Sequence, residues 1–423
     1  MTFNDFQLND LIKQSLQTQG YETPTPIQEQ AIPVVLKGND IMAAAKTGTG
    51  KTAAFSLPII DRLIDGKPAH SKHIRALVLT PTRELAAQVN SSINLYARHT
   101  KLRTYVVFGG VKINPQITQL NKGVDILVAT PGRLLDLYQQ GAVKFDHLDV
   151  LVLDEADRML DMGFIHDIKR IIKALPKKRQ TLMFSATFSK DIQKLAKGLM
   201  QNPEVISLNP DNSSVKSVKQ WLIPVDKKKK SELLFNVIVD EKIDKAIVFM
   251  RTKHSANRLT RYLQERGLRA AAIHGNKSQT ARTKALHQFK EGGVDILIAT
   301  DIAARGIDID QLPYVINFDL PNVAEDYVHR VGRTGRAGAL GKAISLVSAD
   351  EIKQLIDIEK FTKQKINRDY FPGFEPTHEL PSSDWKAKKH PPKKNTGKKT
   401  SHNHKRPSFN KSSDKPNRRP RKK

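Results

Sequence analysis

The octapeptide "GVDILVAT" at residues 123–130 returns almost unchanged as "GVDILIAT" at residues 293–300, with seven of the eight positions identical. A short aliphatic run that begins after a glycine and stops at a threonine is typical of a buried β-strand. Two copies in one chain suggest two domains of similar architecture. Since ligands gather at the carboxyl ends of strands in α/β sheets, Thr130 and Thr300 would each lie at a ligand-binding edge.

The rest of the chain follows the same pattern in both halves. Aliphatic runs alternate with amphipathic helical segments, and the runs lie at 41–45, 76–80, 105–110, 126–130, 150–157 and 181–187, then at 246–250, 270–275, 296–301, 314–319 and 343–348. Nearly continuous apolar strands separated by helices predict a parallel sheet covered on both faces. We therefore expect an α/β fold with two tandem domains.

The boundaries follow from changes in composition. The segment "NPDNSSVKS" is polar and has no periodicity, so it reads as a linker. We expect an N-terminal domain at 1–208, a linker at 209–217, a C-terminal domain at 218–369 and a basic disordered tail at 370–423.

The composition excludes several classes of protein. There is no cysteine among the 423 residues, which excludes disulfides, thiolate metal sites and cysteine nucleophiles. No apolar run approaches the ~18 residues needed to cross a bilayer, and the N-terminus does not resemble a signal peptide. We expect a cytoplasmic protein that makes no contact with a membrane.

The positive charge is concentrated near the C-terminus. Of the formal net charge of +27, residues 385–423 contribute +15 through 16 Lys or Arg and one Asp. This segment is rich in Lys, Pro, Ser and Asn and has almost nothing to bury, which predicts a disordered arm. Such an arm attracts polyanions through counterion release, so we expect it to add affinity for nucleic acid. A merely solubilising tail is the alternative.

The stretch "AKTGTGKT" lies between a strand-like run and a helical pattern. A glycine-rich loop in this position directs backbone N–H groups and a helix N-terminus at a phosphate. Lys51 would neutralise the β and γ phosphates, and the Thr52 hydroxyl would bind Mg²⁺. The predicted nucleotide site comprises Ala45, Lys46, Thr47, Gly48, Thr49, Gly50, Lys51 and Thr52, with Ala45 in place of the usual first glycine.

Two acidic residues end the strand-like run "VLVLDEAD" at 150–157. Asp154 would hold Mg²⁺, and Glu155 would orient and deprotonate the attacking water. Adjacent acids can also form a solvated rim. Their position after an apolar strand, in a chain that carries a phosphate loop, favours catalysis.

Hydrolysis also needs positive charge at the departing γ-phosphate, and the stretch "HRVGRTGR" at 329–336 offers it. Arg330, Arg333 and Arg336 recur every three residues with glycines between them. A salt-bridge ladder along one side of a helix is the alternative. As arginine fingers they would place ATP between the two domains.

These motifs together resemble those of the DEAD-box RNA helicases of superfamily two. They occur in family order as "GYETPTPIQ", "AKTGTGKT", "PTRELAAQ", "GG", "TPGR", "DEAD", "SAT", "QTAR", "ATDIAARGID" and "HRVGRTGR". The match spans roughly residues 3 to 350 and implies two RecA-like domains. Phrases such as "DMGFIHDIKR" at 161–170 are similar to the bacterial RhlE subgroup.

The resemblance implies further nucleotide contacts. Gln28, in the base-reading segment within residues 1–29, would recognise adenine, because its amide offers both a donor and an acceptor. Phe3 matches an upstream aromatic residue that stacks on the base, although an aromatic near a terminus can equally anchor a core. Asp308 would bind the ribose hydroxyls beside the arginine fingers Arg333 and Arg336.

Three further residues would link the nucleotide to the RNA. His329 resembles a relay from the nucleotide site, and so do Ser185 and Thr187 of "SAT". As short polar residues after a strand, Ser185 and Thr187 could instead cap a turn.

By the same resemblance, both domains would hold the RNA backbone. The residues implied are Arg83, Gly110, Thr130 and Arg133 in the first domain and Arg251, Gln279, Arg282, Thr300 and Gly306 in the second. Each copy of the octapeptide would thus deliver one threonine to a single RNA strand. Phosphate contacts position a strand without reading its sequence, so little base specificity is expected.

The implied activity is ATP-dependent unwinding of RNA by local strand separation. Two alternatives stay open, a DNA translocase of the same superfamily and an ATP-gated RNA clamp or annealing factor. The sequence does not name the cellular RNA, and ribosome-assembly or RNA-decay factors are the partner classes to consider.

Overall fold

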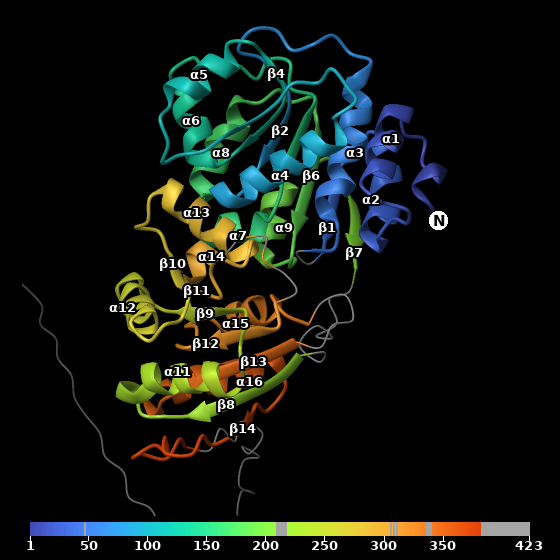
Figure 1. Ribbon diagram of the computed structural model, residues 1–423. Coiled ribbons are helices and arrows are strands. Elements are labelled where there is room, and N and C mark those ends of the chain that lie inside the picture. Colours follow the sequence, from blue (N-terminus) through green and yellow to red (C-terminus); the bar gives the residue numbers. More distant parts are fainter. Residues whose placement is uncertain are drawn as a thin grey trace, which may run out of the picture. The chain divides into compact units, whose positions relative to one another are not determined.

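The computed structural model describes residues 1–45, 48–208, 218–304, 307, 309, 312–335 and 341–381 (Figure 1). These contain two sheets of seven strands each. The first sheet has the order β3-β4-β2-β5-β6-β1-β7, and the second has the order β10-β11-β9-β12-β13-β8-β14. Every pairing between neighbouring strands is parallel. The prediction of two tandem parallel-sheet domains is therefore confirmed, and below we call them the first and second lobes.

The strands of the first lobe are β1 (Ile41–Ala44), β2 (Ile74–Leu79), β3 (Thr104–Val107), β4 (Val124–Ala129), β5 (Val150–Leu153), β6 (Gln180–Ser185) and β7 (Glu204–Ser207). Its helices are η1 (Phe3–Asp5), α1 (Asp10–Thr18), α2 (Pro26–Leu36), α3 (Lys51–Ile64), α4 (Arg83–Tyr96), α5 (Asn114–Leu120), α6 (Pro131–Gln139), α7 (Ala156–Asp161), α8 (Ile165–Ala174) and α9 (Lys190–Lys197).

The strands of the second lobe are β8 (Val218–Pro224), β9 (Ala246–Met250), β10 (Ala270–Ile273), β11 (Ile296–Thr300), β12 (Tyr314–Asn317), β13 (Gly341–Val347) and β14 (Asn367–Arg368). Its helices are η2 (Lys227–Lys229), α11 (Lys230–Asp240), α12 (Lys253–Gln264), α13 (Gln279–Lys290), α14 (Asp301–Ala304), α15 (Ala324–Val331), η3 (Ala349–Glu351) and α16 (Ile352–Thr362).

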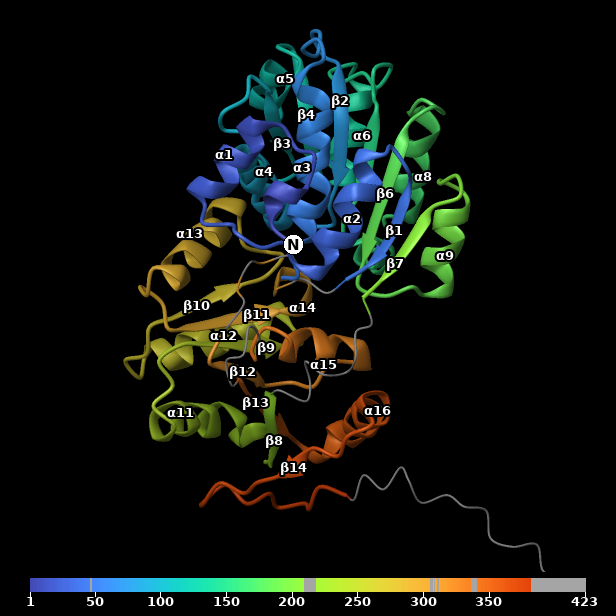
Figure 2. The ribbon, with the colours of Figure 1, turned by 90° about the vertical axis from the view of Figure 1, so that its right-hand side faces the viewer.

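Successive side chains of the central strands point to opposite faces of the sheet, and both faces are buried, so these strands form continuous apolar runs in the sequence. In β5, Val150 and Val152 join one hydrophobic cluster, to which α1 to α4 contribute, while Leu151 and Leu153 join a second cluster with residues of α6, α8 and α9. Figure 2 shows helices on both sides of this sheet. A strand that is buried on both faces has no polar side, so the whole run is apolar.

The repeated octapeptide occupies the same place in both lobes. Its copies form β4 and β11, each second from one edge of its sheet. In both copies the aspartate amide donates to an arginine carbonyl of the preceding segment, from Asp125 to Arg103 and from Asp295 to Arg269. The Asp295 carboxylate binds the Arg269 guanidinium through two atoms, at 2.8 and 2.5 Å. The aspartate of the repeat thus hydrogen-bonds the residue that precedes the edge strand, β3 in the first lobe and β10 in the second.

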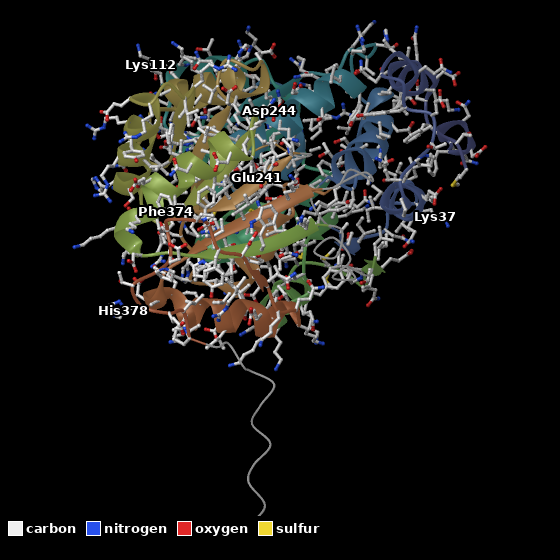
Figure 3. The ribbon with its side chains drawn as sticks, turned by 60° about the horizontal axis from the view of Figure 1, so that its bottom comes forward. Lys37, Lys112, Glu241, Asp244, Phe374 and His378 are labelled. Atoms are coloured by element: carbon white, nitrogen blue, oxygen red, sulfur yellow. The ribbon has the colours of Figure 1, made fainter. Side chains whose placement is uncertain are left out.

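The C-terminal boundary differs from the one expected from the sequence. The tail was predicted to begin at residue 370, but residues 370–381 belong to the described part of the chain and lie on the second lobe. Phe374 is 8% exposed and packs in one apolar cluster of that lobe (Figure 3), and Leu380 is buried in another. The predicted start at 370 is therefore too early, because these apolar side chains extend the core. The predicted linker at 209–217 lies outside the described residues.

None of the helices in the described ranges combines the length and the hydropathy that crossing a bilayer would require.

Candidate functional site

The phosphate loop is built around two glycines with positive φ. Gly48 has φ +82°, and Gly50, which precedes α3, has φ +91°. A Cβ on Gly50 would lie 2.4 Å from Nε2 of Gln28, so no larger residue fits there without displacement. Gln28 accepts from the Thr25 amide at 2.9 Å and donates to the Gly50 carbonyl at 3.1 Å. The predicted adenine reader therefore contacts the phosphate loop directly.

Lys51 and Asp154, two charged residues beside this loop, each carry a buried atom that has no hydrogen-bond partner among the described residues. The atoms are Nζ of Lys51, which begins α3 and is 6% exposed, and Oδ1 of Asp154, which follows β5 and is 2% exposed. Burial raises the pKa of Asp154 to about 6, opposed by the charge of Lys51 and reinforced by that of Glu155. Buried polar groups without protein partners are usually satisfied by a ligand or an ion. An ammonium and a carboxylate fit a phosphate and Mg²⁺ respectively.

Glu155 adopts the left-handed conformation, with φ +53° and ψ +51°, at the start of α7. This backbone is uncommon for a residue with a side chain, and such conformations cluster at functional sites. The carboxylate is buried and lies 3.1 Å from the guanidinium of Arg158. The predicted general base is therefore held by a sharp turn and an ion pair. The sequence analysis did not single out Arg158.

A second contact missed from the sequence joins "DEAD" to "SAT". The Asp157 carboxylate accepts from the Ala186 amide at 2.9 Å. Ser185 donates its hydroxyl to the Thr187 carbonyl at 2.8 Å, and the Ser185 carbonyl accepts from the Ala45 amide at 3.0 Å. These bonds connect the start of the phosphate loop, the acidic motif and the predicted coupling residues. The sequence signal that could have pointed to this contact is that Asp157 is the last residue of "DEAD".

The arginines of "HRVGRTGR" have different environments. Arg330 is 2% exposed, and its guanidinium binds both carboxylate oxygens of Asp301 at 2.6 and 2.7 Å. This is the structural ion pair that the sequence left open as an alternative. Arg333 donates to the Ile307 carbonyl at 2.9 Å, and together with His329 it lines a small cavity that Arg158 also reaches.

Phe3 is buried, with 5% of its surface exposed. Its ring centroid lies 6.0 Å from that of Phe6 and 6.4 Å from that of Tyr21. It belongs to the main apolar cluster of the first lobe, as a core anchor would. Stacking on a base would require its ring to be uncovered.

Several predicted RNA contacts of the first lobe lie around one cavity of about 500 Å³. Its lining includes Arg83, Glu84, Thr130, Arg133, Gly275 and Arg282. Thr130 precedes the first turn of α6, where backbone N–H groups are available to an anion. Gly110 has φ +80°, and a Cβ there would lie 2.0 Å from Nη1 of Arg83. The glycine is thus required for the arginine to lie against the loop.

Glu84, which lines this cavity, pairs with two predicted RNA contacts of the second lobe. Its carboxylate lies 2.9 Å from the guanidinium of Arg282 and accepts from Nε2 of the Gln279 side chain at 2.8 Å. Arg83 donates to Oε1 of the Gln279 side chain at 3.3 Å. Burial lowers the pKa of Arg282, and the charge of Glu84 opposes this. Glu84, missed from the sequence although it lies in "PTRELAAQ", supplies an anion where a phosphate was expected.

Arg251 donates to the buried Glu351 at 2.6 Å, and Glu351 also pairs with Lys230. Thr300 ends β11, as the repeat predicted. Thr52 lies half-buried in the first turn of α3, beside Lys51. The predicted residues Lys46, Thr47, Gly306, Asp308 and Arg336 lie outside the described residues.

Comparisons with known proteins identify the family. The DEAD/DEAH box helicase family matches residues 25–195, and the helicase conserved C-terminal domain matches residues 229–338. The ATP-dependent RNA helicase CshA of Listeria monocytogenes is 44% identical over 364 residues, which cover 86% of this chain and 69% of that protein. The DEAD-box ATP-dependent RNA helicase CshA of Geobacillus kaustophilus is 41% identical over 367 residues, covering 87% and 78%.

Solved structures give the same result. Dbp5 of S. cerevisiae bound to RNA and ADP BeF3 superposes with a TM-score of 0.78 at 32% identity, covering 87% of this chain and 95% of that one. A DEAD box protein of Methanococcus jannaschii gives 0.51 at 39% identity, covering 87% and 99%. These relatives do not test the narrower resemblance to the RhlE subgroup, which stays a prediction. The chain belongs to the DEAD-box family and is an ATP-dependent RNA helicase, with the RNA-stimulated ATPase activity that this implies.

Proposed function

We propose that this helicase uses ATP and Mg²⁺ to separate short RNA duplexes or remodel ribonucleoproteins by local strand separation, with the residues described above in the following roles. Lys51 and the amides around Gly48 and Gly50 bind the β and γ phosphates. The unpartnered Nζ of Lys51 supports this, because a buried ammonium needs a counter-charge. Gln28 and Asp308 bind the base and the ribose.

Thr52 and Asp154 would hold Mg²⁺, which when bound neutralises charge on the phosphate oxygens. Glu155 accepts the proton of the attacking water. Arg333 and Arg336, with His329, complete the site from the second lobe and stabilise charge on the departing phosphate. The best support for these roles is that the unpartnered buried atoms of Lys51 and Asp154 belong to the phosphate loop and to the acidic motif.

The RNA would lie along the cavity that holds Arg83, Thr130, Arg133 and Arg282. It would replace Glu84 as the partner of Arg282, because a phosphodiester offers the same negative charge. ATP and RNA binding together would favour a closed form that admits one bent strand but not an A-form duplex. Hydrolysis would reset the open form. We also propose that the enzyme works in the cytoplasm.

Strand displacement tests this proposal. We expect a short RNA duplex to be separated with ATP and Mg²⁺ but not with ADP, and the same duplex in DNA to stay paired. Tight ATP-dependent RNA binding with no strand released would instead identify an ATP-gated clamp, which the comparisons do not favour.

Truncation tests the basic tail. Removal of residues 385–423, which carry +15, should weaken RNA binding and flatten its salt dependence, because fewer counterions are released. ATPase activity without RNA should not change. Titrations of a labelled RNA at several salt concentrations measure the slope, and an unchanged slope would discard the proposed role of the tail.

A further inference from the structure

A cavity of about 740 Å³ lies at the edge of the second sheet, and none of its lining residues is assigned above to ATP or RNA. Its floor contains the three alanines that begin β10, and its walls come from α12 and α13. Figures 1 and 2 show β10 at the outer edge of this sheet, with α12 and α13 on either side. β10 pairs with β11 alone, so no described strand covers its other edge. We call this cavity the β10 groove.

The internal repeat explains why the edge is hollow here. β3 occupies the equivalent edge of the first sheet and has the same register against its copy of the octapeptide. Ala270, Ala271 and Ala272 correspond in this register to Thr104, Tyr105 and Val106 of β3. A smaller side chain replaces a larger one at each position, and this leaves space over the faces of the sheet at its edge.

The backbone of β10 is oriented to accept another strand. The Arg269 carbonyl accepts from the Asp295 and Ile296 amides of the neighbouring segment, at 2.8 and 3.1 Å. Backbone groups alternate sides along a strand, so Ala271 faces β11 while Ala270 and Ala272 face the groove. The Ala270 carbonyl accepts from Nε2 of Gln264 at 2.8 Å. The N–H and C=O of Ala272, a residue that is 8% exposed, point to the side of β10 that no described strand covers.

The charge of the groove selects the partner. Arg261, Lys277 and Lys284 line it, and no described acid pairs with any of them. Arg269 also lines the groove but is neutralised by Asp295. No Asp or Glu belongs to the lining. An extended segment with acidic side chains would meet both the open backbone edge and the basic walls.

We propose that the β10 groove binds an acidic, extended segment of a partner protein, which adds to the second sheet as a strand beside β10. The four residues of β10 would pair with about 13 Å of such a segment. The tail of this chain has the wrong charge, at +15 for residues 385–423. A peptide is favoured over single-stranded RNA because only a peptide backbone can pair with the edge of β10, and RNA binding to the basic walls is an outcome of the test below.

The full-length protein is titrated with a fluorescein-labelled hexapeptide in which Glu and Val alternate. We expect saturable binding, with the Kd raised at least about tenfold by the double variant Arg261→Glu, Lys284→Glu, since attraction becomes repulsion. A probe with Lys in place of Glu should gain affinity for this variant. Arg258→Glu changes a charge on α12 that does not line the groove, and it should alter the Kd less than about twofold.

Amide exchange distinguishes strand addition from a merely electrostatic contact. Saturating acidic peptide should slow hydrogen exchange over residues 270–273 in the wild-type protein, because the Ala272 amide becomes hydrogen-bonded. Without peptide, the double variant should keep its RNA-stimulated ATPase activity. Absence of saturable binding, insensitivity to the double variant or unchanged exchange would each overturn the proposal. A loss of 12-nucleotide RNA affinity in the double variant, comparable to its loss of peptide affinity, would identify an RNA surface instead.

Discussion

Glu155→Gln should abolish turnover while leaving ATP and RNA bound. The amide cannot take the proton of the attacking water, so RNA-stimulated hydrolysis should fall by about 10²- to 10⁴-fold. The side chain keeps its size and can still accept a hydrogen bond from Arg158, which lies 3.1 Å away. The variant should therefore stay on RNA in the presence of ATP. Single-turnover hydrolysis, with anisotropy of a labelled RNA, measures both effects.

The matched control is Glu204→Gln, which makes the same chemical change at an exposed position where β7 begins. It should hydrolyse ATP at the wild-type rate. Hydrolysis by Glu155→Gln at that rate would show that another group activates the water. Rapid release of the variant from RNA would show that bound, unhydrolysed ATP does not hold the protein on RNA.

Arg330→Met should destabilise the second lobe strongly. The change removes both bonds to Asp301 and those to the Asn317 side chain and the Asp319 carbonyl. Breaking a buried ion pair typically costs about 3–5 kcal/mol, and because Asp301 is partly exposed we expect a loss of about 3 kcal/mol. Urea denaturation followed by tryptophan fluorescence measures it. In a Trp385→Phe background, Trp221 of β8 is the sole tryptophan and reports on this lobe.

Arg258→Met provides the comparison, since Arg258 is an exposed arginine on α12. It should move the denaturation midpoint little. An Arg330→Met midpoint within error of wild type would show that the ion pair with Asp301 adds nothing to stability. Arg330 would then be open again to a role at the nucleotide.

The sequence predicted the fold well because both sheets are buried on two faces. Their strands stand out as apolar runs, and the octapeptide marks equivalent strands. The tail boundary was missed because Phe374 and Leu380 are isolated apolar residues in a polar stretch with no periodicity. Their burial depends on contacts with strands far away in the sequence.

The same limit applies to the site. Arg330 and Arg333 have almost identical local surroundings in the sequence, and what distinguishes them is Asp301, 29 residues away from Arg330. The acidic motif predicted Asp154 and Glu155, but the ion pair of Glu155 with Arg158 depends on how α7 turns after Glu155. Chemistry carried by a motif can be predicted from residue types, whereas partners that come together only in the fold cannot.

In its proposed role as the adenine reader, Gln28 would connect recognition of the base to the conformation of the phosphate loop, because it donates a hydrogen bond to the Gly50 carbonyl. One amide hydrogen and one lone pair of the Gln28 side chain remain for a purine. Their hydrogen bonds to the base would shift Gln28 and, with it, the loop that binds the triphosphate. A guanine nucleotide would therefore bind weakly for two reasons. Its base edge does not match the donor and acceptor of Gln28, and the phosphate loop would not take the conformation that binds the triphosphate.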